Sequence, residues 1–323
     1  MFYDVTTLYF EAFESDELRK TGFSKDNKSQ QPQILIGLMV SKEGFPVAYE
    51  LFPGNTFEGH TLLPVIKSFI NKHNVKDFTV VADAAMISSA NVQELKKENI
   101  HYIVGARLGN VSTEIVRQID QQLPREDGKM IRLNTSNGFL IFGYSQQRFK
   151  KDKFEMQKQI EKANHLIKNP AKNRRVKFIK TESNQMELNT SLIAKTTMLL
   201  GVKGYYSDLP ENIADNKTII KNYHDLYKVE QAFRISKHDL QSRPIFHFKE
   251  DPIRLHILIC FMSLAISRYI ELKTGASIRA FLTMSKKVTD ARLFNKITQK
   301  AITLRSKMED PLPLFLEKLR LPY

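Results

Sequence analysis

The first 108 residues alternate between strand-like and helix-like segments in one order, and that order limits the folds open to the chain. Phe2–Phe10, Gln33–Val40 and Phe45–Phe52 are rich in β-branched and aromatic residues, which is typical of strands. The turn residues Lys42-Glu43-Gly44 separate the second segment from the third. Short turns of this kind join antiparallel strands, so the three segments predict a three-strand meander.

A helix, a strand, a second helix and a last strand follow the meander. Apolar residues recur at helical spacing from Gly59 to His73. Phe78–Ala82 and His101–Gly105 are apolar enough for buried strands, and a helix capped by Ser88-Ser89 is expected to run between them to about Lys97. The resulting order, βββαβαβ, predicts an α/β fold with a mixed sheet flanked by helices.

Residues 109–208 differ in character and are predicted to form an inserted, β-rich and basic subdomain. A strand-like run, Gly138–Tyr144, precedes a long charged helix from about Phe149 to Ile167. Between Gln147 and Lys180 there are twelve Lys or Arg residues: Arg148, Lys150, Lys151, Lys153, Lys158, Lys162, Lys168, Lys172, Arg174, Arg175, Lys177 and Lys180. They predict a positive face, although a solvated helix and loop is the commoner explanation of a charge run.

Residues 209–323 are expected to be helical and to complete the domain begun by residues 1–108. From Lys217 to Leu240, side chains recur at intervals of three and four, which predicts one face of one helix. These side chains are Ile220, Tyr223, Tyr227, Glu230, Phe233 and Lys237. Arg243-Pro244 would break the helix, and the apolar run Leu255–Ile270 predicts a buried helix.

The net charge of +14, from 49 Lys and Arg against 35 Asp and Glu, favours a polyanionic partner but does not identify it. A basic surface that only keeps a protein soluble would look the same. The single cysteine, Cys260, excludes an intrachain disulfide and a Cys/His zinc cluster, as in reducing, cytoplasmic proteins. Leu255–Ile270 is shorter than the roughly 20 apolar residues of a bilayer span, so no membrane association is expected.

Two aspartates stand out by their position. Asp4 lies within the first predicted strand, where a carboxylate is disfavoured, and Asp83 directly follows the fourth strand. Either one alone could be an ordinary turn or capping residue. If the first and fourth strands are neighbours in the sheet, the two carboxylates converge, and a divalent metal is the usual way to reconcile such acids.

Glu230 is the candidate for a third acid. Two Mg²⁺ ions about 3.5–4 Å apart are a common device for phosphoryl displacement, and several carboxylates are needed to hold them. An amphipathic helix with Glu230 facing water is the alternative, but Tyr223 and Phe233 on the same predicted face fit that alternative poorly.

Over nearly its whole length the sequence resembles the DDE transposases of bacterial insertion sequences, specifically the cut-and-paste group of insertion-sequence family four. The resemblance rests on YDVTT, GLMVSKEGFPVAYELFPGNTFEGHTLLP, VVADAAMISSANVQEL and KGYYSDL, and on the spacing Tyr223-x2-Leu226-x3-Glu230-x6-Lys237. Phe233-Arg234 and Ser242-Arg243-Pro244-Ile245 accompany that spacing. The family signature is Tyr-x2-Arg-x3-Glu-x6-Lys, a motif long enough to be specific.

The resemblance implies an RNase H-like fold in which Asp4, Asp83 and Glu230 bind two Mg²⁺ or Mn²⁺ ions. It also implies that Tyr223 and Lys237 contact DNA near the transferred end, with Lys237 as a phosphate partner. Relatives act as homodimers on paired transposon ends and join the 3′-hydroxyl to target DNA, so DNA and a second copy of the chain are the expected partners. A bacterial, nucleoid-associated location follows from the same resemblance.

Three departures from the family pattern bear on these expectations. Leu226 replaces the signature Arg and cannot contact phosphate, so Arg234 or Arg243 would have to supply that anchor. The chain has no Trp to stack on an extruded base, which leaves Tyr144, Phe149 or another aromatic. Asp4 stands four residues from the start, where relatives carry an end-binding region, so the chain resembles a truncated product whose first strand would fray.

Two other functions therefore stay open beside an active transposase. One is a catalytically inactive remnant that binds DNA or inhibits a full-length enzyme, which the short N-terminus and Leu226 favour. The other is a two-metal nuclease on the same fold that cuts DNA without joining it.

Overall fold

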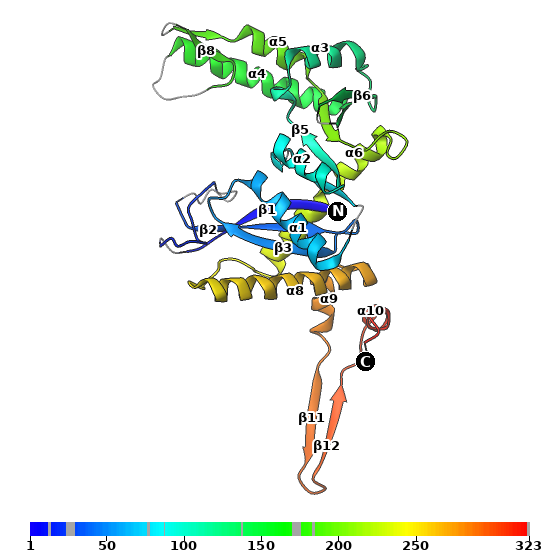
Figure 1. Cartoon of the computed structure of the whole chain (residues 1–323). Helices are drawn as coiled ribbons and strands as arrows, with labels where there is room; N and C mark the ends of the chain where they lie inside the picture. The colour runs from blue at the N-terminus through cyan, green and yellow to red at the C-terminus, as the bar shows by residue number, and fades with distance from the viewer. Residues whose placement is uncertain are drawn as a thin grey trace. The chain divides into compact units, whose positions relative to one another are not determined.

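The computed structural model describes residues 1–11, 14–23, 30–75, 78–86, 88–136, 138–169, 176–182 and 185–321 (Figure 1). The chain forms two compact units. The first unit combines Met1–Asn74 with Leu226–Tyr323, and the second consists of Val75–Asp225. Strands, both parallel and antiparallel, and helices occur together, which confirms the predicted mixed α/β class.

The first unit contains the predicted meander. Its strands are β1 (Phe2–Tyr9), β2 (Gln33–Val40) and β3 (Pro46–Pro53), paired antiparallel in the order β3-β2-β1. Pairing of β1 with β2 starts at Phe2, opposite Val40. Gly44 adopts a φ of 83° in the turn before β3, a conformation that glycine adopts without strain. The meander and its turn are therefore confirmed.

Helices cover both faces of this meander, as its fully buried middle strand β2 requires. Helix α1 (Leu62–His73) packs on β2 and β3, and the Tyr3 hydroxyl donates to Thr61 Oγ1 at 2.7 Å on that side. Helix α7 (Tyr227–Arg234) packs on β1 and β2, and α8 (Glu250–Thr274) packs on β3.

The second unit is built on five strands in the order β4-β5-β10-β7-β6. Their bounds are Thr79–Ala82, His101–Ala106, Val202–Ser207, Gly138–Tyr144 and Met130–Thr135, in that spatial order. Strands β4 and β5 are parallel and are joined through helix α2 (Ser89–Lys97). The Ser88 hydroxyl accepts from the Asn91 backbone N–H at 3.1 Å, so the predicted helix start is confirmed.

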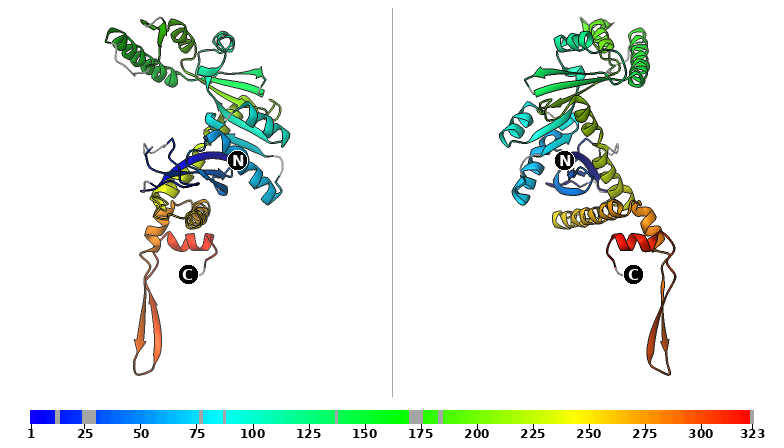
Figure 2. Two further views of the ribbon diagram at one scale, coloured as in Figure 1. Left: turned by 60° about the vertical axis from the view of Figure 1, so that its left-hand side comes forward. Right: turned by 90° about the vertical axis from the view of Figure 1, so that its right-hand side faces the viewer.

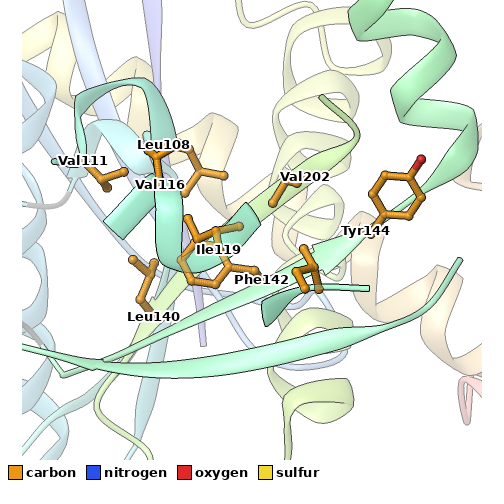
Figure 3. Close-up of a cluster of buried hydrophobic side chains, with 9 residues drawn as sticks. Leu108, Val111, Val116, Ile119, Leu140, Phe142, Tyr144 and Val202 are labelled. Carbon is orange, nitrogen blue, oxygen red and sulfur yellow. The ribbon is translucent and has the colours of Figure 1, made fainter. Parts of the chain in front are cut away.

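The core of the second unit lies between the sheet and helix α3 (Thr113–Gln122), as Figure 3 shows. Val116 and Ile119 from α3 meet Leu140 and Phe142 from β7 in this core. Helices α4 (Gln146–Lys168) and α5 (Thr190–Met198) and a small hairpin, β8 (Ile179–Glu182) and β9 (Gln185–Leu188), complete the segment. Lys172, Arg174 and Arg175 of the predicted positive face lie outside the described residues.

The prediction of one continuous helix from Lys217 to Leu240 is wrong. Helix α6 (Asn216–His224) ends before α7 begins at Tyr227, and a π-helical turn, Ile235–Asp239, follows α7. The break falls at Asp225 and Leu226, where the second compact unit ends and the first resumes. Tyr223 and Glu230 therefore lie on different helices, and Tyr223 is buried whereas Glu230 is exposed.

The prediction of a buried helix at Leu255–Ile270 is also wrong. Helix α8 buries Ile253, Ile257 and Leu264, but Leu255 is 57% and Ile266 is 61% exposed. Because apolar residues surround the helix, its sequence does not reveal which face packs on the sheet. By length and composition alone α8 could cross a membrane, a weak criterion that core helices of soluble proteins also meet.

The end of the chain is not entirely helical, contrary to expectation. After α9 (Ile278–Ser285), strands β11 (Asp290–Asn295) and β12 (Lys300–Arg305) form an antiparallel hairpin, and α10 (Leu312–Lys318) follows. Figure 2 shows this hairpin as a two-stranded ribbon. On the apolar face, each strand carries only two residues at alternate positions: Ala291 and Leu293 in β11, and Ile302 and Leu304 in β12. A pattern this short is not recognised as a strand in the sequence.

Candidate active site

Asp83 lies at the carboxyl end of β4, a parallel strand, where ligand sites in α/β proteins commonly form. The strand itself is anchored by Val80, Val81 and Ala82, all buried, while Asp83 is exposed. Its Oδ1 accepts from the Ala84 backbone N–H at 2.6 Å and from the Tyr223 hydroxyl at 3.1 Å. Two donors thus fix the orientation of one carboxylate oxygen, and among the described residues no donor contacts the other.

Tyr223 is held in place by its neighbours in the second unit. Its ring packs against that of Tyr205 on β10 with the centroids 4.9 Å apart and the planes at 63°. A Cβ atom at Gly105 of β5 would lie 2.6 Å from the Tyr223 hydroxyl oxygen, so the glycine allows the close approach. The packed ring therefore holds the Tyr223 hydroxyl within hydrogen-bond distance of Asp83.

Lys203 is a site residue that the sequence analysis missed. Its ammonium group lies 4.7 Å from the ring centroid of Tyr223 and 5.4 Å from that of Tyr205, within cation–π range. Lys203 and Tyr205 alternate along β10 and so share one face of the sheet. That alternation within KGYYSDL was the available signal.

The titratable groups around Tyr223 differ in charge. Burial, and secondarily Lys203, lower the pKa of His224, whose Nε2 lies 3.3 Å from the Tyr205 hydroxyl oxygen. Burial raises the pKa of Tyr205 to about 12. At neutral pH His224 and Tyr205 are therefore uncharged, and Lys203 is the cation of this cluster.

Asp4 and Glu230 both belong to the first unit. Asp4 pairs across the sheet with Leu38, which lines a small cavity together with Thr6 and Phe233. Residues directly opposite on paired strands point to the same face, so Asp4 is on the face that α7 covers. Glu230 lies on α7, exposed beside the buried residues Val229 and Ala232.

The three predicted phosphate partners are placed differently. Arg234 is exposed and lines an open concavity of about 520 Å³ with Glu230, Tyr227 and Gln231. Lys237 is half-buried in the π-helical turn, and the Arg243 guanidinium lies 5.8 Å from the Tyr9 ring centroid.

Leu226, which stands where the resemblance leads us to expect an Arg, is a core residue with 7% of its surface exposed. The sequence and the structure agree that this position provides no phosphate anchor.

The donor chemistry of the three acids fits a hard divalent cation, since Mg²⁺ and Mn²⁺ prefer oxygen ligands. Among the described residues, however, no three His, Cys, Asp or Glu side chains are gathered as a metal-binding group. Asp83 belongs to the second unit and Asp4 and Glu230 to the first. Convergence of the three acids therefore stays a prediction.

Tyr144, one candidate for base stacking, is packed into the core of the second unit (Figure 3). It is 5% exposed, and its hydroxyl donates to Gln146 Oε1 at 2.7 Å. Phe149 packs against the same core. Phe154 on α4, by contrast, is 57% exposed, with the Lys158 ammonium 4.3 Å from its ring centroid.

Comparison with known proteins finds a family match that spans all of these residues. A family model described as the transposase DDE domain matches residues 4–266. No curated protein gives a match. Among solved structures, the chain is similar to a chain in the cryo-EM structure of the piggyBac transposase synaptic complex with hairpin DNA, at 11% identity and a TM-score of 0.48. The match covers 88% of this chain and 51% of that one, so the chain spans about half the length of that relative.

Proposed function

Because the chain belongs to the transposase DDE domain family, we propose that it is an insertion-sequence transposase that cleaves DNA and transfers the cut strand. The observation that carries this proposal is the Asp83 carboxylate, held at a strand end by the Tyr223 hydroxyl and the Ala84 N–H. Outer partners such as the Tyr223 hydroxyl orient metal-binding carboxylates, so an acid held in this way is suited to hold a metal ion.

Asp4, Asp83 and Glu230 would hold two Mg²⁺ or Mn²⁺ ions, which when bound activate the attacking hydroxyl and stabilise the leaving oxygen at the phosphodiester. The chain's own contribution is positioning. Tyr223 orients Asp83. The resemblance also implies that Tyr223 and Lys237 contact DNA. Arg234 or Arg243 would replace the signature Arg as a phosphate anchor.

Transposon ends and target DNA are the proposed ligands, and a homodimer on paired ends is the proposed assembly. The net charge of +14 supports a polyanionic ligand because cations near phosphates release condensed counterions. Exposed Arg234 beside Glu230 places a guanidinium next to a proposed metal ligand, where a scissile strand would approach.

The proposal is tested by Glu230→Gln and Asp83→Asn in a cleavage assay on transposon-end DNA with Mg²⁺ or Mn²⁺, together with Mn²⁺ binding followed by electron paramagnetic resonance. Both variants are expected to abolish cleavage and weaken Mn²⁺ binding, since each removes a ligand charge. Glu317→Gln, an exposed acid on α10, is the matched control and should cut normally. Equal cutting by Glu230→Gln and the unaltered protein would show that the site assignment is wrong.

The two other functions give different results in the same assay. A catalytically inactive remnant would bind the DNA without cutting it under any metal condition. A nuclease would produce cut DNA but no joined products when target DNA is supplied.

A further inference from the structure

The hairpin β11–β12 is exposed along its whole length and strongly basic. All residues of both strands are exposed. Residues 286–307 contain a single acid, Asp290, against seven cations: Lys286, Lys287, Arg292, Lys296, Lys300, Arg305 and Lys307. The segment lies beyond residue 266, where the match to the transposase DDE domain ends. The hairpin is therefore an element that the family match does not cover.

The register of the hairpin gives it two unlike faces. Leu293 lies opposite Ile302, and Ala291 lies opposite Leu304, so one face is apolar. Leu293 and Ile302 are 54% and 56% exposed. An isolated two-stranded hairpin is marginally stable in water, so a hairpin of this kind is best explained by a partner that covers it.

The tip of the hairpin presents an apolar side chain between cations. Ile297 is 93% exposed, and Lys296 and Lys300 flank it. The tip is fixed by its own hydrogen bonds: Asn295 Oδ1 accepts from the N–H groups of Ile297 and Thr298 at 2.9 and 3.1 Å. Ile297 is thus held outward by an ordered turn.

The charges identify the partner. Asp290 pairs with Arg305 at 2.8 Å and Lys287 lies 3.8 Å from Glu309, but in the described part of the chain no carboxylate pairs with Arg292, Lys296 or Lys300. A second copy of the hairpin would bring like charges together, which opposes docking. Duplex DNA takes up such cations at its phosphates, and two-stranded β-ribbons are known to enter its grooves.

We propose that β11–β12 is an arm that binds duplex DNA, with Arg292, Lys296 and Lys300 at phosphates and Ile297 inserted against the bases. Exposed apolar side chains on architectural proteins insert between base steps and bend the duplex, and Ile297 has the chemistry and position for this. This inference deepens the proposed function and rests on it in taking DNA as the ligand. It adds a DNA-contacting element remote in sequence from the acids.

The test measures binding of the full chain to a fluorescein-labelled duplex by anisotropy at several salt concentrations. The double variant Lys296→Gln/Lys300→Gln should lose about tenfold in affinity, and the slope of log K against log salt should become shallower by about two. The control Lys273→Gln/Lys318→Gln removes two exposed lysines of the same unit from α8 and α10 and should leave both values unchanged.

Ile297→Ala tests the insertion of this side chain between bases separately from the contribution of the lysine charges to binding. It should reduce the bending of a duplex labelled at both ends, measured by energy transfer, and weaken binding about threefold with no change in salt slope. Thermal unfolding followed by circular dichroism checks that each variant folds, which the full exposure of these side chains leads us to expect.

Unchanged affinity and salt slope in the double lysine variant would overturn the arm proposal. So would a conversion of dimers to monomers by Leu293→Gln/Ile302→Gln, seen by light scattering, with DNA affinity unaltered, because the hairpin would then be an interface between copies. Failure of the catalytic proposal is distinguishable, since a chain that never cuts DNA would still show arm-dependent binding.

Discussion

At the scale of single residues, the hydrogen bond from Tyr223 to Asp83 is the most informative contact of the candidate site. The sequence resemblance predicts that Tyr223 contacts DNA, yet its hydroxyl lies 3.1 Å from a carboxylate oxygen of Asp83. The ring is fixed by Tyr205 and Lys203, so its hydroxyl reaches Asp83 without ordering a mobile side chain. Tyr223 is therefore best described as a positioning residue for Asp83.

Tyr223→Phe tests this role, because it removes the hydroxyl and keeps the ring. Loss of a partner that orients a metal ligand typically costs about 10- to 100-fold in activity or metal affinity, and we expect a loss of that size in Mn²⁺ affinity. The free energy of unfolding, measured by urea denaturation, should fall by about 1 kcal/mol because one hydrogen bond is lost. Tyr206→Phe, which removes a hydroxyl from β10, is the control. Unchanged Mn²⁺ affinity in Tyr223→Phe would exclude a positioning role.

Buried tyrosines make the stability of the fold sensitive to alkaline pH. Burial raises the pKa values of Tyr3 and Tyr102 well above 10.0, and that of Tyr205 to about 12. Their neutral forms are favoured in the folded chain, so this stabilisation is complete below pH 10.0 and is lost as pH rises above it.

We therefore expect the free energy of unfolding to fall above pH 10, by up to about 1.4 kcal/mol per pH unit for each such tyrosine. For Tyr205 the loss should level off near its folded pKa of about 12. Urea denaturation from pH 8 to 11 measures this, and Tyr205→Phe should make the decline shallower. Tyr227→Phe, at a 54% exposed position, is the control. A decline of the same steepness in Tyr205→Phe would refute the assignment to burial.

At the scale of elements, the sequence predicts the strands and helices whose own residues carry a clear signal, such as an apolar run or a capping serine. The strand Gln33–Val40 was predicted with the bounds that the structure has, and Ser88 was predicted as a helix cap. The charged helix expected from Phe149 to Ile167 runs from Gln146 to Lys168. The signals are a short apolar run for the strand, a serine cap for α2 and a long charged segment for α4.

Elements whose form depends on distant packing were not predictable in the same way. The break between α6 and α7 falls at Asp225 and Leu226, where the second unit ends and the first resumes, and no Pro or Gly marks it. Which face of α8 is exposed depends on which side of the helix packs on β3, and the residues of the helix alone do not determine that. Likewise, the two acids could be selected by position. The alternation in KGYYSDL puts Lys203 and Tyr205 on one face of β10, but the place of Lys203 beside Tyr223 arises only when β10 and α6 pack together.

At the scale of the whole molecule, the first unit is assembled from both ends of the chain. All eight residues of β2 are buried, so the meander needs cover on both faces. Helix α1, close in sequence, covers one face, whereas α7 and α8 come from beyond residue 225. The second unit, by contrast, is one continuous segment with its own core of α3, β7 and β10 side chains.

Ending the chain after Asp225 should therefore affect the two units unequally. The meander would lose the helices that cover Thr6, Leu8 and Leu38, and exposing apolar surface costs about 25 cal/mol per Å². Hydrogen–deuterium exchange should show lost protection over residues 33–40 and retained protection over residues 138–144. A chain ended after Ser285, which keeps α7 and α8, should protect both segments. Protection of residues 33–40 in the shorter chain would contradict this account, since the first 74 residues would then complete their core without the C-terminal helices.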